Sequence, residues 1–163
     1  TIVPRRYARR MHHASTSRYI DNWYVSTEDS QIASYAGGKH LIQRPPYLAE
    51  DKTPTEAALV HALYQVTGYD FAVLLQPTSP LRTIEDIDRC IEIAIDSHQR
   101  YGITGCVSYN PWGKRNGAVY VCHVEHFLQF LSFDASHHYE MPMERCLDID
   151  YVWDFDAHED TDR

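Results

Sequence analysis

Residues 71–100, FAVLLQPTSPLRTIEDIDRCIEIAIDSHQR, read as a strand, a rigid polar loop and a helix in immediate succession. The run FAVLLQ (71–76) is apolar up to its last residue, which is typical of a strand buried on both faces of a sheet. From Thr83 onwards the apolar residues recur at helical spacing, and Thr83 with Asp86 forms a capping-box pattern. A buried strand that leads directly into an amphipathic helix indicates an α/β domain.

The remaining sequence continues this alternation of strands and helices. Further strands are predicted at 22–26, 39–46, 104–109 and 117–123, and further helices at 28–38, 53–68, 123–131 and 151–160. We expect Thr53 to cap the helix over 53–68, with Pro54 in its first turn. The prediction is a single domain over residues 1–163, with an α/β fold in three layers and a mostly parallel sheet.

Length, charge and cysteine content narrow the class of protein. A chain of 163 residues, 44% of them hydrophobic, suits one domain with one core. No stretch approaches the roughly 18 apolar residues of a membrane span, and the basic start TIVPRRYARR is not followed by the apolar segment of a signal peptide. The net charge of −8 argues against binding along a nucleic-acid backbone. The four cysteines form no CxxC pair, which favours a reducing, cytoplasmic location over a zinc or disulfide framework.

Residues 76–82, QPTSPLR, lie where an α/β sheet binds its ligands, beyond the carboxyl end of a strand. Two prolines, Pro77 and Pro80, restrict the backbone between them. Four side chains of the loop offer hydrogen-bonding groups, namely Gln76, Thr78, Ser79 and Arg82. The guanidinium group of the arginine can bind a carboxylate or a phosphate through two parallel hydrogen bonds. The alternative is that the hydroxyls merely cap the next helix, and spacing alone leaves both interpretations open.

Five segments of the chain resemble the acylneuraminate cytidylyltransferases. They are VSTEDSQIASYA (25–36), QRPPYLAEDKTPTEAALVHAL (43–63), LLQPTSPLRTIEDID (74–88), KRNGAVYV (114–121) and ERCLDIDYVWDF (144–155). They follow the family's order over roughly residues 20–159, so the match is more specific than any one motif. The resemblance implies a Rossmann-like nucleotidyltransferase fold. It also implies a reaction in which CTP activates a nonulosonic sugar acid, such as a sialic acid, and pyrophosphate is released.

The DID sequence at 148–150 carries the metal prediction. Asp148 and Asp150 are at strand spacing, so both would project from the same face of an extended segment. Carboxylate oxygens on one side of a site suit Mg²⁺, which also uses water and substrate phosphates as ligands. The resemblance implies that these two aspartates are the metal ligands. The alternative is a pair of solvated acids at the end of a strand.

The resemblance also assigns substrate contacts. Gln76, with Thr78, Ser79 and Arg82 of the same loop, is expected to meet the sugar acid, and Asn116 is the second contact, with Gly117 allowing close backbone approach. Residues expected near the nucleotide are Arg5, Arg6, Arg44, Thr53 and Thr55. For Arg44 the alternative is a surface salt bridge.

Two departures from the family pattern affect the functional prediction. The family begins with a strand and a glycine-rich, lysine-containing loop around the CTP phosphates, whereas residues 7–23 contain neither glycine nor lysine. Four arginines (Arg5, Arg6, Arg9 and Arg10) could supply side-chain charge instead. The family's long excursion before its Asn-Gly-Ala strand, which builds the dimer contact, is also missing. The alternatives are therefore a catalytically impaired homologue that only binds its ligands, or a fragment that needs another chain for its phosphate loop, and a homodimer is possible only without the usual insert.

Overall fold

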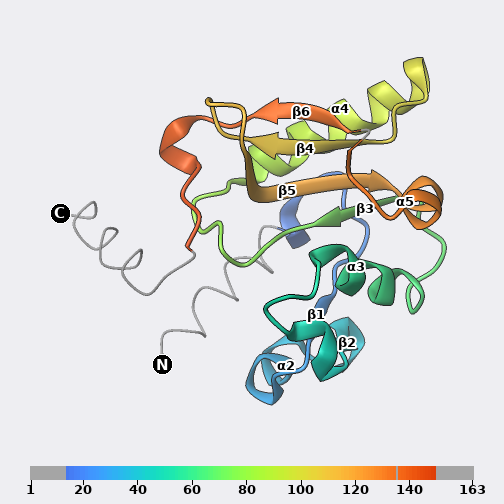
Figure 1. The fold of residues 1–163 in the computed structure, drawn as a ribbon. Coiled ribbons are helices and arrows are strands. Elements are labelled where there is room, and N and C mark those ends of the chain that lie inside the picture. The colour runs from blue at the N-terminus through green and yellow to red at the C-terminus, as the bar shows by residue number, and fades with distance from the viewer. Residues whose placement is uncertain (1–13, 135, 150–163) are drawn as a thin grey trace.

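The computed structural model describes residues 14–134 and 136–149 (Figure 1). Its helices and strands are β1 (Val25–Thr27), α2 (Ser30–Ala36), β2 (Leu41–Gln43), α3 (Thr55–Leu63), β3 (Phe71–Leu74), α4 (Ile84–Tyr101), β4 (Gly105–Tyr109), β5 (Arg115–His123), α5 (Val124–Phe130) and β6 (His137–Glu140). Three short 3-10 helices are η1 (Gly38–His40), η2 (Pro46–Ala49) and η3 (Met143–Arg145). The helix predicted over 151–160 lies outside the described residues, and β6 was not predicted.

Two apolar clusters on opposite faces of one sheet produce a three-layer arrangement. On one face the buried side of α4, including Ile87, Cys90 and Ile91, packs against β4 and β5. On the other face Leu59 of α3 and Phe127 of α5 pack against residues of β4 and β5. Successive residues of a strand point to opposite faces, so β5 contributes to both clusters. The fold is therefore mixed α/β with helices on both sides of the sheet, as predicted.

The sheet is not mostly parallel, and this part of the prediction is wrong. The four-stranded sheet has the order β3-β5-β4-β6, in which β5 is antiparallel to both its neighbours and only β4 and β6 are parallel. Residues 110–114 join β4 to β5. A parallel crossover needs about a dozen residues or more, so this short connection can only form a hairpin. Within it Asn110 donates its N–H to the Lys114 carbonyl at 2.8 Å and accepts the Gly113 N–H at 2.9 Å.

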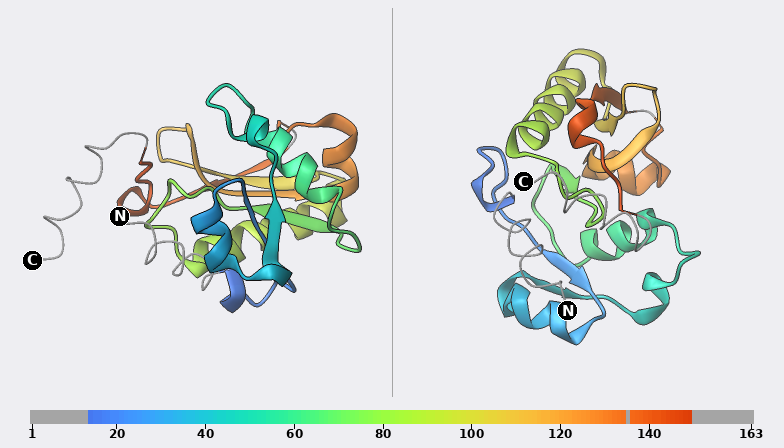
Figure 2. Two further views of the ribbon diagram at one scale, coloured as in Figure 1. Left: turned by 90° about the horizontal axis from the view of Figure 1, so that it is seen from below. Right: turned by 90° about the vertical axis from the view of Figure 1, so that its left-hand side faces the viewer.

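A second sheet consists of β1 and β2, which are parallel. Among the described residues β3 pairs with β5 alone, and all four β3 residues are half-buried. Alternate residues of β3 pack against the two clusters on opposite faces, Phe71 and Val73 on one and Ala72 and Leu74 on the other, so the strand is covered on both faces as predicted, although its residues are only half-buried. In the right-hand view of Figure 2, α2 and α4 lie at opposite ends of the molecule. The strand edges of β1 and β3 contribute to the cavity described below.

Local capping signals explain where two helices begin. The predicted capping box of α4 is present, with Thr83 Oγ1 and the Asp86 carboxylate each accepting the other residue's N–H. The predicted Thr53 cap of α3 is wrong. The helix begins at Thr55 after Pro54, and Thr53 Oγ1 donates to the Tyr47 carbonyl at 2.9 Å instead. Proline disfavours helical backbone in the residue before it, which moves the helix start past Thr53.

The four cysteines are free thiols, and Cys106 and Cys122 are buried as expected for small core residues. Among the described residues, no helix combines the length and apolar character that a membrane span requires. The single-domain prediction for residues 1–163 and the cytoplasmic location remain predictions.

Two stacked histidines, His98 of α4 and His123 at the end of β5, should make the free energy of unfolding depend on pH. The rings of His98 and His123 stack with centroids 4.4 Å apart, and Phe71 packs edge-on against both. Burial, followed by the charge of His98, lowers the pKa of His123, although Glu125 and Asp70 partly oppose this. The neutral form of the His123 ring is thus favoured in the folded state. Because the unfolded state binds the proton more readily, the free energy of unfolding falls as the pH drops below about 6.5.

We expect the free energy of unfolding in urea to decrease between pH 8 and pH 5.5, and His123→Gln to reduce that decrease. The matched control is His61→Gln on α3, which should retain the wild-type pH dependence. An unchanged pH dependence in His123→Gln would show that the stacked pair does not cause it.

Candidate functional site

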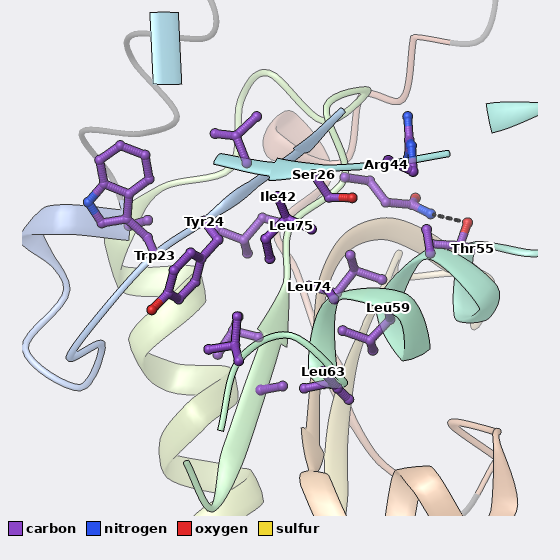
Figure 3. A pocket seen from close by; sticks show the side chains of 18 of the residues that line it. Trp23, Tyr24, Ser26, Ile42, Arg44, Thr55, Leu59, Leu63, Leu74 and Leu75 are labelled. Atoms are coloured by element: carbon purple, nitrogen blue, oxygen red, sulfur yellow. Dashed lines mark hydrogen bonds between the residues drawn. The ribbon is translucent and has the colours of Figure 1, made fainter. Parts of the chain in front are cut away.

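A cavity of about 1210 Å³ is lined by residues of β1 and β3, with α3 and α4 contributing side chains to its wall. One part is apolar and includes Trp23, Tyr24 and Leu63. Another part is polar and includes Arg44 and Thr55, which Figure 3 shows together, away from Leu63 and Tyr24. Its size and its combination of apolar wall and few polar groups are typical of a small-molecule site.

The polar end brings together residues from four distant segments. Gln76 follows β3, and its Nε2 donates to Thr55 Oγ1 at the start of α3 at 3.3 Å, the dashed line in Figure 3. Gly117 of β5 lies so close that a Cβ there would collide with Gln76 Oε1 and stand 3.6 Å from Asp148 Oδ2. Gln76, Thr55 and Asp148 all line the cavity. The structure therefore gathers predicted sugar-acid, nucleotide and metal residues in one place.

An irregularity in β5 puts Gly117 in this position. Val107 pairs with Tyr120, yet Tyr109 pairs with Arg115 rather than with Ala118, the partner in an unbroken register. Such bulges redirect the backbone and are often found beside active sites. Gly117 has a φ of +72°, a conformation that residues with a Cβ rarely adopt.

Asn116 holds the bulge from inside the protein. Its Oδ1 accepts from Ser108 Oγ at 2.6 Å and from the Ala118 N–H at 3.2 Å, and the residue is buried. Its amide nitrogen lies 3.2 Å from Met141 Sδ. In this arrangement Asn116 shapes the backbone next to Gln76. Its predicted direct contact with substrate stays a prediction.

Two residues of loop 76–82 point into the protein, contrary to their expected exposure to a ligand. Arg82 is 2% exposed, and its Nη1 donates to the carbonyls of Gln76 and Ala118. Ser79 is also 2% exposed and donates to the Asn116 carbonyl at 3.4 Å. A buried guanidinium group needs hydrogen-bond acceptors within the protein, and main-chain carbonyls provide them here. These side chains therefore hold the loop against β5, whereas Gln76 and Thr78 line the cavity.

Asp148 lies on an irregular segment after β6, not on a strand as its spacing suggested. The next residue, Ile149, donates its N–H to the Thr78 carbonyl at 2.9 Å, which ties this segment to loop 76–82. Asp148 is half-buried and lines the cavity. Asp150, Arg5 and Arg6 lie outside the described residues.

Arg44 lines the cavity but is engaged by an acid. Its Nε donates to Glu28 Oε2 at 3.0 Å, and its Nη2 contacts the same oxygen. The hydrogen bonds from Arg44 lower the pKa of the Glu28 carboxyl, so the pair is ionised at neutral pH. The salt-bridge interpretation of Arg44 is the one that this geometry supports. Thr53 lines the cavity too, although its hydroxyl is bound to Tyr47.

The described wall of the cavity is acidic. Arg44 is the only lysine or arginine among its described lining residues, whereas five carboxylates line it: Asp21, Glu28, Glu50, Asp70 and Asp148. A triphosphate placed here would need added positive charge, either from a bound cation or from residues outside the described range. This charge balance could not be read from the sequence, because it depends on which acids the fold brings together.

Gly117 offers a direct test of the geometry at the polar end. Gly117→Ala should destabilise the fold by about 1–3 kcal/mol, because a Cβ is strained at this φ, and it should also displace Gln76. The control is Gly113→Ala, where φ is +78° but a Cβ meets nothing within 4 Å. We expect both variants to lower the free energy of unfolding in urea, and only Gly117→Ala to weaken the sugar-acid binding that the sequence predicts for Gln76. Equal behaviour of the two variants in binding would contradict the close approach to Gln76.

Comparison with known proteins supports the resemblance seen in the sequence. An N-acylneuraminate cytidylyltransferase from Escherichia coli O18:K1:H7 (strain RS218 / NMEC) is 26% identical to this chain over 181 residues. The match covers 88% of this chain and 42% of the relative, so the chain spans less than half the length of that protein. No protein-family model matches the chain. The similarity confirms the predicted resemblance to acylneuraminate cytidylyltransferases.

Proposed function

We propose that this chain is a cytidylyltransferase that transfers CMP from CTP to a nonulosonic sugar acid. The hydroxyl oxygen of the sugar acid would attack the α-phosphorus, the bond to the β-phosphate would break, and pyrophosphate would leave. The observation that carries the proposal is the convergence of Gln76, Thr55, Gly117 and Asp148 at one end of the cavity. Transfer of a phosphoryl group depends mainly on positioning and charge neutralisation, which such a convergence can supply.

Gln76 is the residue that we propose contacts the sugar acid. Its side-chain amide lies at the polar end of the cavity and can both donate to and accept from sugar hydroxyls. The bulge at Gly117 keeps the space beside the amide free of a Cβ. Thr78, on the same loop, also lines the cavity and is the second candidate for a contact with the sugar acid.

Mg²⁺ fits the donors at this end of the cavity. The carboxylate and hydroxyl oxygens of Asp148 and Thr55 are the hard ligands that it prefers, and it needs only one or two carboxylates beside water and phosphate. Asp148 would hold the ion together with Asp150. When bound, the ion would neutralise charge on the reacting phosphates. Within the described residues no group of three or more His, Cys, Asp or Glu side chains forms a metal cluster.

A binding protein without turnover is the second candidate. The acidic wall of the cavity favours it, because Arg44 is already paired with Glu28 and the remaining described lining residues supply no basic side chain. For the enzyme, Arg5 and Arg6 must then contribute to triphosphate binding. The third possibility, a fragment completed by another chain, agrees with the 42% coverage of the relative.

Calorimetric titration separates these candidates. The enzyme should bind CTP more tightly than CMP, and the preference should depend on Mg²⁺. A protein that never distinguishes CTP from CMP cannot hold the triphosphate, and the binding-only function would then replace the proposed one. Formation of pyrophosphate from CTP and N-acetylneuraminic acid would distinguish an enzyme from a protein that binds both ligands without reaction.

Gln76→Ala should weaken the binding of N-acetylneuraminic acid about fivefold and leave CTP binding unchanged, because one side-chain hydrogen bond is worth about 1 kcal/mol. Gln65→Ala is the control, since this glutamine follows α3 and bonds to His61 instead. Isothermal titration with each ligand measures both effects. A variant that loses CTP and keeps the sugar acid would show that the loop serves the other substrate.

A further inference from the structure

The carboxylate of Asp86 contacts both segments that carry the proposed substrate and metal residues. We infer that Asp86 is the common anchor of these segments, and that Arg145 is a positioning residue for Asp148. The inference rests on the proposed function, since it assigns a purpose to the placement of Asp148. Asp86 itself is fully buried at the start of α4 and does not line the cavity.

The first attachment holds the end of loop 76–82. Thr83, the residue after the loop, donates its N–H and its hydroxyl to Asp86 Oδ2 at 3.0 and 3.1 Å. In return Thr83 Oγ1 accepts the Asp86 N–H at 3.4 Å. These bonds cap α4 and fix the point at which the loop joins the helix.

The second attachment holds the segment that carries Asp148. Arg145 Nε donates to Asp86 Oδ2 at 2.9 Å, and its Nη2 donates to Oδ1 at 2.8 Å. Tyr139 of β6 adds its hydroxyl to Oδ1 at 2.8 Å. A bidentate ion pair of this kind fixes the orientation of the two side chains as well as the distance between them. A helix cap needs only the Thr83 bonds, so the arginine pair adds a connection to a segment 59 residues later.

Asp148 is therefore carried on a short span that is attached at both ends. Arg145 binds Asp86 on one side, and the Ile149 N–H binds the Thr78 carbonyl on the other. Loss of the arginine attachment removes the ion pair that fixes one end of this span. Displacing a catalytic group by about 1 Å can cost about 100-fold in rate, so such a remote attachment can control activity.

Cys146 provides a reporter of this attachment that does not depend on activity. It follows Arg145 directly, and its thiol lies 3.3 Å from the Pro142 carbonyl and 3.4 Å from the Met141 carbonyl. It is half-buried, whereas Cys90, Cys106 and Cys122 are buried. Local opening of the segment should therefore increase the reaction of Cys146 with a thiol reagent before the other cysteines react.

The experiment compares wild type with Arg145→Gln and Arg145→Lys in two assays. In the first, the Mg²⁺ concentration for half-maximal CTP binding should rise about tenfold or more in Arg145→Gln, as for other residues that orient metal ligands, while CTP binding in EDTA stays the same. Arg145→Lys should retain part of the wild-type Mg²⁺ affinity.

In the second assay, Ellman's reagent should label Cys146 faster in Arg145→Gln than in wild type. The variant Cys146→Ser identifies which part of the signal comes from this thiol. Arg100→Gln, which removes the exposed pair with Asp96, should match wild type in both assays.

Wild-type labelling of Cys146 in Arg145→Gln, with an unchanged Mg²⁺ requirement, would overturn the inference. An equal loss of CTP binding with and without Mg²⁺ would also overturn it, because it would indicate general damage. If wild type itself shows no Mg²⁺-dependent CTP binding, the proposed function fails, and the labelling assay alone decides the anchoring. If circular dichroism shows that Arg145→Gln does not fold, Arg145→Lys and Tyr139→Phe replace it, with smaller shifts in the same direction expected.

Discussion

For the proposed cytidylyltransferase, Asp148→Asn is expected to reduce the formation of CMP-sugar from CTP and N-acetylneuraminic acid by about two orders of magnitude or more. The neutral amide of asparagine binds a hard divalent cation more weakly than a carboxylate does. A bound metal ion stabilises the transferring phosphate by several kcal/mol. Each loss of about 1.4 kcal/mol lowers the rate tenfold. Single-turnover release of pyrophosphate at saturating CTP measures the effect. Raising the Mg²⁺ concentration should recover part of the rate.

The control for Asp148→Asn is Glu50→Gln, which removes one negative charge from the same cavity wall at an exposed position. This variant should keep the wild-type rate. Asp150→Asn should resemble Asp148→Asn, because both carboxylates are proposed as ligands. Wild-type turnover and Mg²⁺ dependence in Asp148→Asn would show that Asp148 is not a metal ligand, and the solvated-acid alternative would then hold.

Signals within one element were sufficient to predict most helices and strands. The capping box of Thr83 and Asp86 and the apolar stripe of α4 involve neighbours in sequence, and both are present in the structure. Asp29, at the start of α2, similarly caps its helix with 2.8 and 2.9 Å bonds to the next turn. Strand β6 was missed because only alternate residues of HHYE are half-buried, and its sequence lacks an apolar run.

The direction in which polar side chains point could not be predicted, because it depends on partners far along the chain. Arg82 looked available to an anion, but the carbonyl of Ala118 on β5 draws it inward. Asn116 was predicted to contact substrate, and its contact with Ser108 of the neighbouring strand, which donates to its side-chain oxygen, was not foreseen. The approach of Arg82 to Ala118 follows from the antiparallel pairing of β3 and β5, and the contact of Asn116 with Ser108 follows from the antiparallel pairing of β4 and β5. The short connection at 110–114 was the available signal for that pairing.

The ion pair of Asp86 and Arg145 should give the largest change in stability, and the effect should be asymmetric. Arg145→Met leaves the Asp86 carboxylate fully buried without its cation, which costs about 3–5 kcal/mol. Asp86→Asn leaves Arg145, whose side chain is 28% exposed, in reach of water. We therefore expect the free energy of unfolding in urea at pH 7 to fall more in Arg145→Met than in Asp86→Asn. Arg100→Met, at an exposed pair, should cost less than about 1 kcal/mol.

The pH dependence of the same variants identifies the buried charge as the cause. Burial alone would raise the pKa of Asp86, but the bonds from Arg145, Thr83 and Tyr139 outweigh burial and hold the pKa below its ordinary value. The wild type therefore keeps this contribution above an ordinary aspartate pKa of about 3.9 and loses it as the pH falls through the lowered pKa. In Arg145→Met the bonds from Thr83 and Tyr139 remain, but we expect burial to outweigh them and to raise the pKa of Asp86, so the variant should gain stability relative to wild type as the pH falls.

The stability difference between wild type and Arg145→Met should consequently shrink from pH 7 towards pH 4. In the double variant Asp86→Asn with Arg145→Met, where no carboxylate remains at position 86, the cost of removing Arg145 should be small and independent of pH. A cost of Arg145→Met that stays constant with pH, or that persists in the Asp86→Asn background, would mean that lost packing of the arginine side chain and not the uncompensated carboxylate destabilises the variant.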